Sequence, residues 1–295
     1  MQVRIGSRKS KLALIQTNIV VKLIEKAFPE IKCVVVPMST TGDKITDKNL
    51  YEIGGKALFL KELEEKILDG QIDMAVHSLK DVPGRLADKL MIAAVTERED
   101  PRDCFVSFKY KSIDELPLGS VVGTSSVRRK VVLQQKRPDL KIVPFRGNIH
   151  TRLQKLQNQE VDATILACAG LIRADILNPQ YCYPLEVDQM LPAAGQGTIA
   201  IEVHKDNKIA REICRKINHI SSWHLASAER GLLSYLDASC DTPLSAHAIF
   251  NGDAIEANYM MSDIDGSNIQ YHREVGVIES ASEMGVKAAI KLLNQ

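Results

Sequence analysis

Several kinds of residue and motif are scarce in this sequence. Its 295 residues carry a formal net charge of only +1, and they include one tryptophan and six phenylalanines. Proteins that bind nucleic acid use basic surfaces and stacked aromatic rings, so nucleic acid is disfavoured as a partner. The chain also lacks a Walker loop and a G-x-G-x-x-G motif, which disfavours nucleotides as ligands.

Long apolar runs and paired cysteines are missing as well. No run approaches the length of a membrane span, and the opening M-Q-V-R-I-G-S-R-K-S has no signal-peptide core. The six cysteines include no C-x-x-C pair and have no histidine at ligand spacing, so we predict neither a metal site nor a disulfide framework. These absences indicate a cytoplasmic protein without a membrane partner.

One short stretch, D-M-A-V-H-S-L-K-D-V-P, combines a buried strand with an unusual pair of charges. The apolar run at 75–77 predicts a strand, and Lys80 and Asp81 follow directly beyond its carboxyl end. Ligand sites of open α/β sheets lie at such strand ends. Pro83 restricts Val82 and so helps to hold the charged pair in place. Taken alone, the stretch is better explained by a solvated surface turn, and the functional interpretation depends on the rest of the chain.

Further candidates for anion binding precede this stretch. A strand at 3–5 leads through G-S-R-K-S into a helix that begins at Ser10, so Arg8 lies close to free backbone N–H groups. A polar loop then extends through Asp43. The next helix carries Lys56 in its first turn, where a lysine opposes the helix dipole unless an anion is near.

The second part of the chain repeats the pattern of the first. The segment 121–129, V-V-G-T-S-S-V-R-R, resembles the segment 3–11, and E-V-D-A-T-I-L-A at 160–167 resembles Q-I-D-M-A-V-H-S at 71–78. A charged hinge at 97–103 and the turn L-P-A-A-G-Q-G at 191–197 would connect the two parts. The pattern predicts two similar lobes that face a common cleft, although two unrelated βαβ units would also match weakly.

Five arginines follow predicted strand ends or open helices in the second lobe. In a protein of near-zero net charge, this grouping predicts a cleft for a ligand that bears several carboxylates or phosphates. The five are Arg128, Arg129, Arg146, Arg152 and Arg173.

The last part of the chain has a different pattern of predicted strands and helices. Strands are expected at 246–250, 254–261 and 269–277, followed by a helix with a capping box formed by Ser280 and Glu283. Before them, Cys240 lies in the polar loop D-A-S-C-D-T-P-L, so it is a candidate nucleophile or attachment point as well as an inert surface thiol. The expected domains are 1–97 with 197–217, then 98–196, then an α+β domain at 218–295.

Six motifs together closely resemble the porphobilinogen deaminase family, whose members are also called hydroxymethylbilane synthases. They occur in order over nearly the whole chain: G-G-K-A-L-F-L-K-E, A-V-H-S-L-K-D-V-P, G-T-S-S-V-R-R, R-G-N-I with T-R-L, P-A-A-G-Q-G and the cysteine loop. The resemblance implies an α/β fold of three domains. Two are similar lobes like those of bilobal periplasmic binding proteins, and the third is a small α+β domain with an antiparallel sheet.

The resemblance also implies a reaction and a cofactor. Family members condense four porphobilinogen molecules head to tail, release ammonia each time, and free the linear tetrapyrrole, hydroxymethylbilane, by hydrolysis. Growth takes place on a dipyrromethane cofactor bound by a thioether, here to Cys240. The implied partner is the small molecule porphobilinogen, the implied state is a monomer, and the product would pass to a tetrapyrrole-cyclising enzyme.

Roles for individual residues follow from the same resemblance. Asp81 would be the catalytic carboxylate that holds pyrrole N–H groups and moves protons. Ala238 and Ser239 replace the usual Gly-Gly before the cysteine, which puts the local loop geometry in question. The implied cofactor- and substrate-binding residues are Arg8, Ser10, Asp43, Lys56, Lys80, Thr124, Ser126, Arg128, Arg129, Arg146, Arg152, Arg173 and Gln196.

Three other classes of protein remain as alternatives at this point. A non-catalytic bilobal carboxylate-binding protein would need neither Cys240 nor the third domain. A nucleic-acid binder is disfavoured by the composition described above. A cysteine hydrolase would need a histidine and an acid beside Cys240, an arrangement that the sequence does not reveal.

Overall fold

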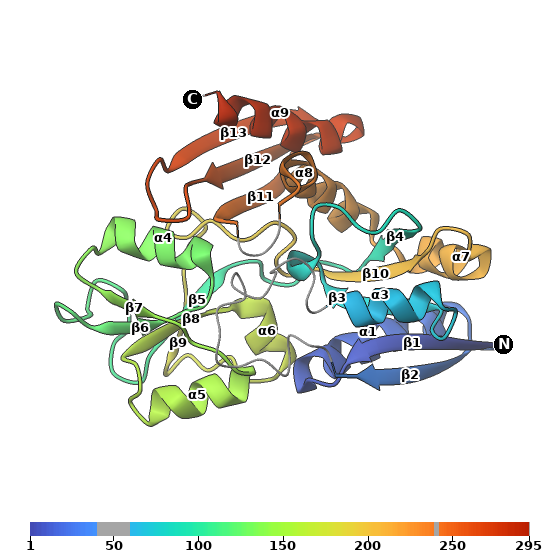
Figure 1. Cartoon of the computed structure of the whole chain (residues 1–295), viewed down its shortest axis with the longest axis horizontal. Coiled ribbons are helices and arrows are strands. Elements are labelled where there is room, and N and C mark those ends of the chain that lie inside the picture. Colours follow the sequence, from blue (N-terminus) through green and yellow to red (C-terminus); the bar gives the residue numbers. More distant parts are fainter. Residues whose placement is uncertain (40–59, 239–241, 295) are drawn as a thin grey trace.

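The computed structural model of the chain describes residues 1–39, 60–238 and 242–294. These residues form three sheets, two of five strands and one of three, each covered by helices (Figure 1). None of the described helices is both long enough and apolar enough to span a membrane.

The first sheet has the strand order β2-β1-β3-β10-β4. β1 is parallel to β2 and to β3, whereas β10 is antiparallel to both β3 and β4. Its apolar side chains, such as Ile5 and Ile201, are fully buried. The bounds are β1 Gln2–Arg8, β2 Lys32–Met38, β3 Met74–Ser78, β4 Leu90–Val95 and β10 Ile199–His204.

The second sheet repeats this topology with the order β7-β6-β8-β5-β9. β6 is parallel to β7 and β8, and β5 is antiparallel to β8 and β9. The prediction of two similar lobes is therefore confirmed strand by strand. The bounds are β5 Asp103–Val106, β6 Val121–Gly123, β7 Lys141–Val143, β8 Ala163–Ala167 and β9 Cys182–Pro184.

The chain crosses between the two sheets twice. β5 opens the second sheet directly after the segment 96–102, and β10 returns to the first sheet after the segment 185–198. Each crossing strand occupies the same antiparallel position in its sheet. The two connectors therefore lie side by side where they leave one lobe for the other, as the hydrogen bond from Glu99 N to Gly197 O at 3.0 Å shows.

Helices begin where the sequence supplies capping side chains. Ser10 Oγ accepts a hydrogen bond from Ala13 N, which confirms the expected helix start, and Ser126 and Asn148 cap their helices in the same way. The helices of the two lobes are α1 Lys11–Ala27, α3 Lys61–Leu68, α4 Val127–Lys136, α5 Ile149–Gln157, α6 Cys168–Arg173 and α7 Lys208–Ile217.

The third sheet is antiparallel throughout and carries two helices on one face (Figure 1). Gly285 lets the helices approach closely, because a Cβ there would collide with the backbone at Leu232. The expected capping box is wrong, since Ser280 makes no side-chain cap and its Oγ donates to Val277 O instead. The elements are β11 Leu244–Asn251, β12 Ala254–Met261, β13 Gln270–Val277, α8 Ile220–Leu236 and α9 Ala281–Leu293.

A buried carboxylate attaches this third part to both connectors. Glu229, on α8, is fully buried and accepts hydrogen bonds from Arg98 Nη1 at 2.7 Å, from Gly195 N at 2.6 Å and from Ala248 N at 2.8 Å. Arg98 and Gly195 belong to different connectors. One side chain therefore joins the two crossings to the sheet that contains Ala248.

Candidate functional site

The turn that carries Lys80 and Asp81 follows β3 without an intervening residue. Leu79–Asp81 forms a single 3-10 turn, which Leu79 N anchors to Thr198 O at 2.9 Å and Val82 N closes onto Leu79 O at 3.1 Å. The predicted buried strand is present, and both charged residues lie at its carboxyl end. The Lys-Asp pair is thus fixed between β3 and the segment that leads into β10.

The third domain supports this turn from behind. Arg230, on α8, donates from Nη1 to Val82 O at 2.9 Å and from Nη2 to Pro83 O at 2.8 Å. Gly84 N donates to Ala238 O at 2.9 Å, and a Cβ at Gly84 would collide with the carbonyl of Leu233. Only glycine permits this close approach, so the backbone after Asp81 is held against the end of α8.

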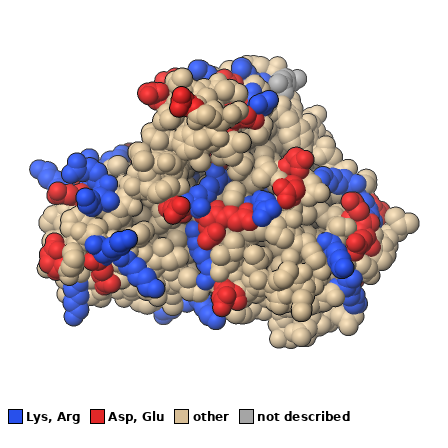
Figure 2. Space-filling view, turned by 180° about the vertical axis from the view of Figure 1, so that it is seen from behind, with Lys and Arg blue, Asp and Glu red and all other residues tan. Residues whose placement is uncertain are grey.

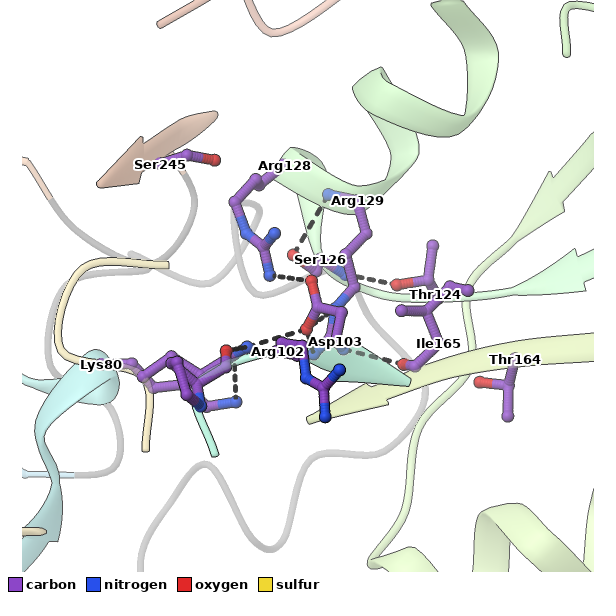
Figure 3. A network of polar contacts seen from close by, with 12 residues as sticks. Lys80, Arg102, Asp103, Thr124, Ser126, Arg128, Arg129, Thr164, Ile165 and Ser245 are labelled. Atoms are coloured by element: carbon purple, nitrogen blue, oxygen red, sulfur yellow. Dashed lines mark hydrogen bonds and ion pairs between the residues drawn. The ribbon is translucent and has the colours of Figure 1, made fainter. Parts of the chain in front are cut away.

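The most buried charge of the second lobe is Asp103, at the start of β5. Its carboxylate is fully buried and accepts from Arg128 Nη2 at 2.7 Å, from Arg129 Nη2 at 2.7 Å and from Gln196 Nε2 at 2.9 Å (Figure 3). Burial alone would raise the pKa of Asp103, but the attraction of both guanidinium groups outweighs it. The pKa is therefore held well below its usual range.

Gln196 connects this cluster to the turn on the first lobe. Its Oε1 accepts from Lys80 Nζ at 3.1 Å, while its Nε2 donates to Asp103 Oδ1 and to Pro101 O. The amide orientation follows from chemistry, because an ammonium can only donate and a carboxylate can only accept. Burial, followed by the charge of Arg129, lowers the pKa of Lys80 to about 8, against the opposing effect of Asp81.

Two further arginines, Arg146 and Arg152, lie in the same electrostatic environment. Burial and the charges of Arg129 and Arg146 lower the pKa of Arg152 to about 10, while Asp81 opposes the shift. Arg152 donates from Nε to Gly147 O at 2.9 Å, and Arg173 donates from Nη2 to Gly197 O at 2.6 Å. Cations from the second lobe and Asp81 from the first therefore influence one another across a single cleft.

Arg8 lies on the first-lobe side of the cleft, whereas the side chain of Ser10 caps α1. Arg8 ends β1 and, together with Gln16, His77 and Ser78, lines a small hollow bordered by Asp81. Gln16 Nε2 donates to Ser78 Oγ at 2.9 Å, which joins α1 to the end of β3. In the view from behind, basic and acidic side chains gather across the middle of the molecule beneath the third domain (Figure 2).

The remaining sequence-predicted residues divide into two groups. Thr124 and Ser126 shape the start of α4, since Thr124 Oγ1 accepts from Ser126 N at 3.2 Å and Ser126 Oγ caps the helix. Asp43, Lys56 and Cys240 lie outside the described residues. Within the described ranges, no group of three or more His, Cys, Asp or Glu residues is arranged to hold a metal ion.

Sequence reasoning missed several residues that build the site. Asp103, Glu229 and Arg230 have partners that are distant in the chain, so their roles could not be inferred from local spacing. One usable signal was the charge of Asp103 at the start of the fully buried strand D-C-F-V. A charged residue in such a strand is retained only when it is paired.

Together, the fold and the site define a two-lobed protein in which cations of both lobes surround the turn that carries Lys80 and Asp81. Comparison with known proteins then identifies the family. The model "Porphobilinogen deaminase, dipyromethane cofactor binding domain" matches residues 3–212, and "Porphobilinogen deaminase, C-terminal domain" matches residues 223–294.

Curated relatives agree over the full length of the chain. "Porphobilinogen deaminase" of Rickettsia canadensis (strain McKiel) is 52% identical over 294 residues, covering 99% of this chain and 98% of the relative. The protein of the same name from Rickettsia bellii (strain OSU 85-389) is 54% identical over 293 residues, covering 99% and 97%. The chain belongs to the porphobilinogen deaminase family.

Membership of this family establishes a transferase of tetrapyrrole synthesis that uses porphobilinogen and contains the domain for a dipyrromethane cofactor. The alternative of a non-catalytic carboxylate-binding protein is not favoured. Among solved structures, a nutrient-binding protein from Burkholderia cenocepacia bound to methionine is 14% identical with a TM-score of 0.47, covering 73% of this chain and 91% of that one.

The donor set of the cleft fits such a cofactor. Lys80 and Arg152 have lowered pKa values because burial and neighbouring cations disfavour their charges, and Asp103 is already occupied by two arginines. Carboxylates on a bound group would relieve this repulsion. A multiply carboxylated pyrrole chain is therefore a suitable occupant of the cleft.

Replacing Asp103 with Asn should destabilise the protein strongly. The change leaves Arg128 and Arg129 buried without their counter-charge, at a cost of about 3–5 kcal/mol in the free energy of unfolding at pH 7. Urea denaturation measures this loss. Because the folded-state pKa lies below the unfolded value of about 3.9, the contribution is present at neutral pH and fades as the pH falls through the folded value.

The matched control is Asp139→Asn, which removes the partner of Arg137 at the surface of the same lobe. This variant should lose far less stability, since the pair is partly exposed, with side-chain exposures of 17% and 27%, and solvent screens it. Equal losses in the two variants would contradict the importance of burial at Asp103.

Lys80→Arg should change how substrate binding responds to alkaline pH. With a pKa of about 8, Lys80 loses its charge as the pH rises, so the KM for porphobilinogen should increase above pH 8, by up to about tenfold per pH unit. An arginine remains charged and should move this increase to higher pH. Lys130→Arg, at an exposed position of α4, is the control, and an identical pH dependence in all three proteins would refute a binding role for Lys80.

Proposed function

We propose that this chain joins four porphobilinogen molecules head to tail into hydroxymethylbilane, with Asp81 as its catalytic carboxylate and Cys240 as the attachment point of the cofactor. The observation that carries the proposal is the position of Asp81, on a braced turn among cations of both lobes. When bound, the dipyrromethane supplies the pyrrole carbon to which the first substrate is joined.

Asp81 is suited to the chemistry of a pyrrole that loses ammonia. A carboxylate accepts hydrogen bonds only, so it can hold ring N–H groups and favour the positive charge that develops as the amine departs. It can also carry a proton between the leaving amine and a ring carbon. The two carbonyls that Arg230 holds fix the backbone directly after Asp81, which limits the range of its side chain.

The arginines differ in how many donors they keep for a ligand. Arg129 uses Nε and Nη2 on Asp103 and Nη1 on Ile165 O, so its donors are largely committed to the protein. Arg152 and Arg173 each donate one hydrogen bond among the described residues. A guanidinium has five N–H donors, so we assign carboxylate binding first to Arg152, Arg173 and Lys80.

The other sequence-predicted residues take supporting places in the proposal. Arg129 and Arg128 act mainly through Asp103, while the remaining described residues lie at helix starts, at strand ends or in the segments between them. These are Arg8, Ser10, Thr124, Ser126, Arg146 and Gln196. For Asp43 and Lys56, which lie outside the described residues, we propose the binding role that the family resemblance implies.

The end of α8 supports the proposed role of Cys240. Asp237 adopts a left-handed conformation with φ 47°, and Ala238 then bonds to Gly84, three residues after Asp81. Ala238 is not among the residues with positive φ, so the first of the two replaced glycines needs no glycine. Cys240 follows two residues later and would serve the same cleft.

The proposal also covers the domain boundaries, the cellular compartment, the oligomeric state and the fate of the product. We assign domains at 1–97 with 197–217, at 98–196 and at 218–295, which places both connectors at domain boundaries. We further propose a cytoplasmic monomer whose product passes to an enzyme that closes the linear tetrapyrrole into a ring.

Intact mass measurement and turnover assays test this function together. The purified protein should exceed its sequence mass by two deaminated porphobilinogen units, and Cys240→Ser should lack the excess. Cys33→Ser, at a half-buried position in β2, should keep it. Asp81→Asn should keep the excess mass yet lose porphobilinogen consumption, because an amide cannot take up the proton.

Two outcomes would contradict the proposal. One is an unmodified wild-type mass that porphobilinogen or a preformed tetrapyrrole does not raise. The other is near-normal turnover by Asp81→Asn.

A further inference from the structure

Three buried thiols lie together in the second lobe. They belong to Cys104 on β5, Cys168 at the start of α6 and Cys182 on β9, whose exposed fractions are 0%, 0% and 3%. All three pack in one apolar cluster with Leu166 and Leu171. Neither the cleft nor the proposed reaction uses these thiols, so their grouping is a separate feature of the lobe.

The strand pairing places Cys104 between the other two cysteines. Cys104 pairs with Pro184 on β9, so Cys182, two residues earlier, lies diagonally opposite on the same face. Cys104 also pairs with Leu166 on β8, and Cys168 follows two residues later. The side chain of Cys104 has hydrogen-bonding interactions with both neighbours. Cys182 therefore lies next to Cys104, whereas the strand β5 separates it from Cys168.

Cys104 and Cys182 differ in how readily their thiols ionise. The hydrogen bond with Cys104, assisted by the backbone of Asn178, lowers the pKa of Cys182 to about 7 against the effect of burial. The pKa of Cys104 is raised by its hydrogen bonds to Cys168 and Cys182 and by burial. Its S–H group also reaches Phe105 O at 3.5 Å, but an ionised sulfur is the stronger acceptor. Near neutral pH, Cys182 is therefore the thiolate of the pair, and thiolate is the reactive form.

The position of Cys182 at an edge of the sheet gives small reagents a route to it. Among the described strands, β9 closes the sheet at one edge, has three residues and pairs with β5. Elements with few contacts open locally at a small fraction of the cost of global unfolding. Opening of β9 exposes Cys182, while Cys104 stays paired with β8. The same freedom lets the two sulfurs approach the bonding distance of about 2.05 Å.

We propose that Cys104 and Cys182 form an oxidant-sensitive dithiol that a small hydroperoxide converts into a disulfide. The Cys182 thiolate attacks a peroxide oxygen and becomes a sulfenic acid, while the O–O bond breaks and releases an alcohol after proton uptake. The Cys104 sulfur then attacks the sulfenic sulfur, the S–O bond breaks, and the departing hydroxide takes up the Cys104 proton. Two thiols and one hydroperoxide thus give one disulfide, one alcohol and one water, and two electrons pass from sulfur to oxygen.

Peptide mapping by mass spectrometry tests this inference on the full-length protein. After treatment with hydrogen peroxide at neutral pH and alkylation of the remaining thiols, the map should contain a peptide pair joined between Cys104 and Cys182. Dithiothreitol should separate the pair. Cys33 and Cys214 are the internal controls and should stay reduced. Burial and Glu25 raise the pKa of the half-buried Cys33, and burial raises that of Cys214 to about 12.

Two matched variants separate the pair from its surroundings. Cys104→Ala removes the hydrogen bond to Cys182, so oxidation of Cys182 should slow by about threefold for each tenfold loss of thiolate. It also removes the resolving thiol, so a dione reagent should trap the sulfenic acid on Cys182. Cys168→Ala truncates an equally buried thiol beside Cys104 and should leave both the disulfide and its rate of formation unchanged. The wild-type map decides the inference even if Cys104→Ala is unstable.

Three results would overturn the inference. The first is a map in which Cys33 is oxidised while Cys182 stays reduced. The second is a disulfide that joins Cys104 to Cys168, or one that Cys168→Ala abolishes. The third is a folded Cys104→Ala protein whose Cys182 reacts as fast as in the wild type. None of these results bears on the proposed function, because the three thiols take no part in it.

Discussion

The buried carboxylate of Asp103 is the interaction on which the cleft depends. It lies where the first connector enters the second sheet, and it binds Arg128, Arg129 and Gln196 at 2.7–2.9 Å. Without it, two guanidinium groups at the start of α4 would repel each other in a nearly dry environment. Through Gln196 the same carboxylate also reaches Lys80, so one charge sets the arrangement of cations from both lobes.

The third domain adds a second constraint of the same kind. Glu229 joins both connectors, and Arg230 holds the two carbonyls after Asp81. The backbone that leads to Cys240 is bonded to the backbone that follows Asp81. The described end of α8, at Ala238, is thus bonded directly to the backbone that follows the proposed catalytic carboxylate. Lys80 and Arg152 carry lowered pKa values that a polyanionic ligand would restore.

Local patterns in the sequence predicted the strands, the helix starts and the charged residues at strand ends well. The strand before Lys80, the cap at Ser10 and the strand at 254–261 are all present, because each depends on near neighbours in the sequence. The repeated pattern also predicted two lobes, which the matching strand orders confirm. Local reasoning failed at Ser280, where the hydroxyl bonds to the preceding strand instead of capping the helix.

The buried charge network was beyond such reasoning. Asp103 and Arg129 are bonded although 26 positions separate them in the sequence, and 131 positions separate Arg98 from Glu229. Only the folded chain reveals these pairs. The acidic residue inside I-A-I-E-V-H was a visible anomaly, but its partner His77 lies 125 positions away. The sequence therefore located the cleft, and the structure is needed to explain how its charges are held.

A crystal structure of the protein with its cofactor in place would test the central claim most directly. The account predicts that ring N–H groups contact the Asp81 carboxylate, that side-chain carboxylates of the cofactor contact Lys80, Arg152 or Arg173, and that the covalent bond is to Cys240. A cofactor whose rings lie away from Asp81, or whose carboxylates avoid these cations, would contradict it.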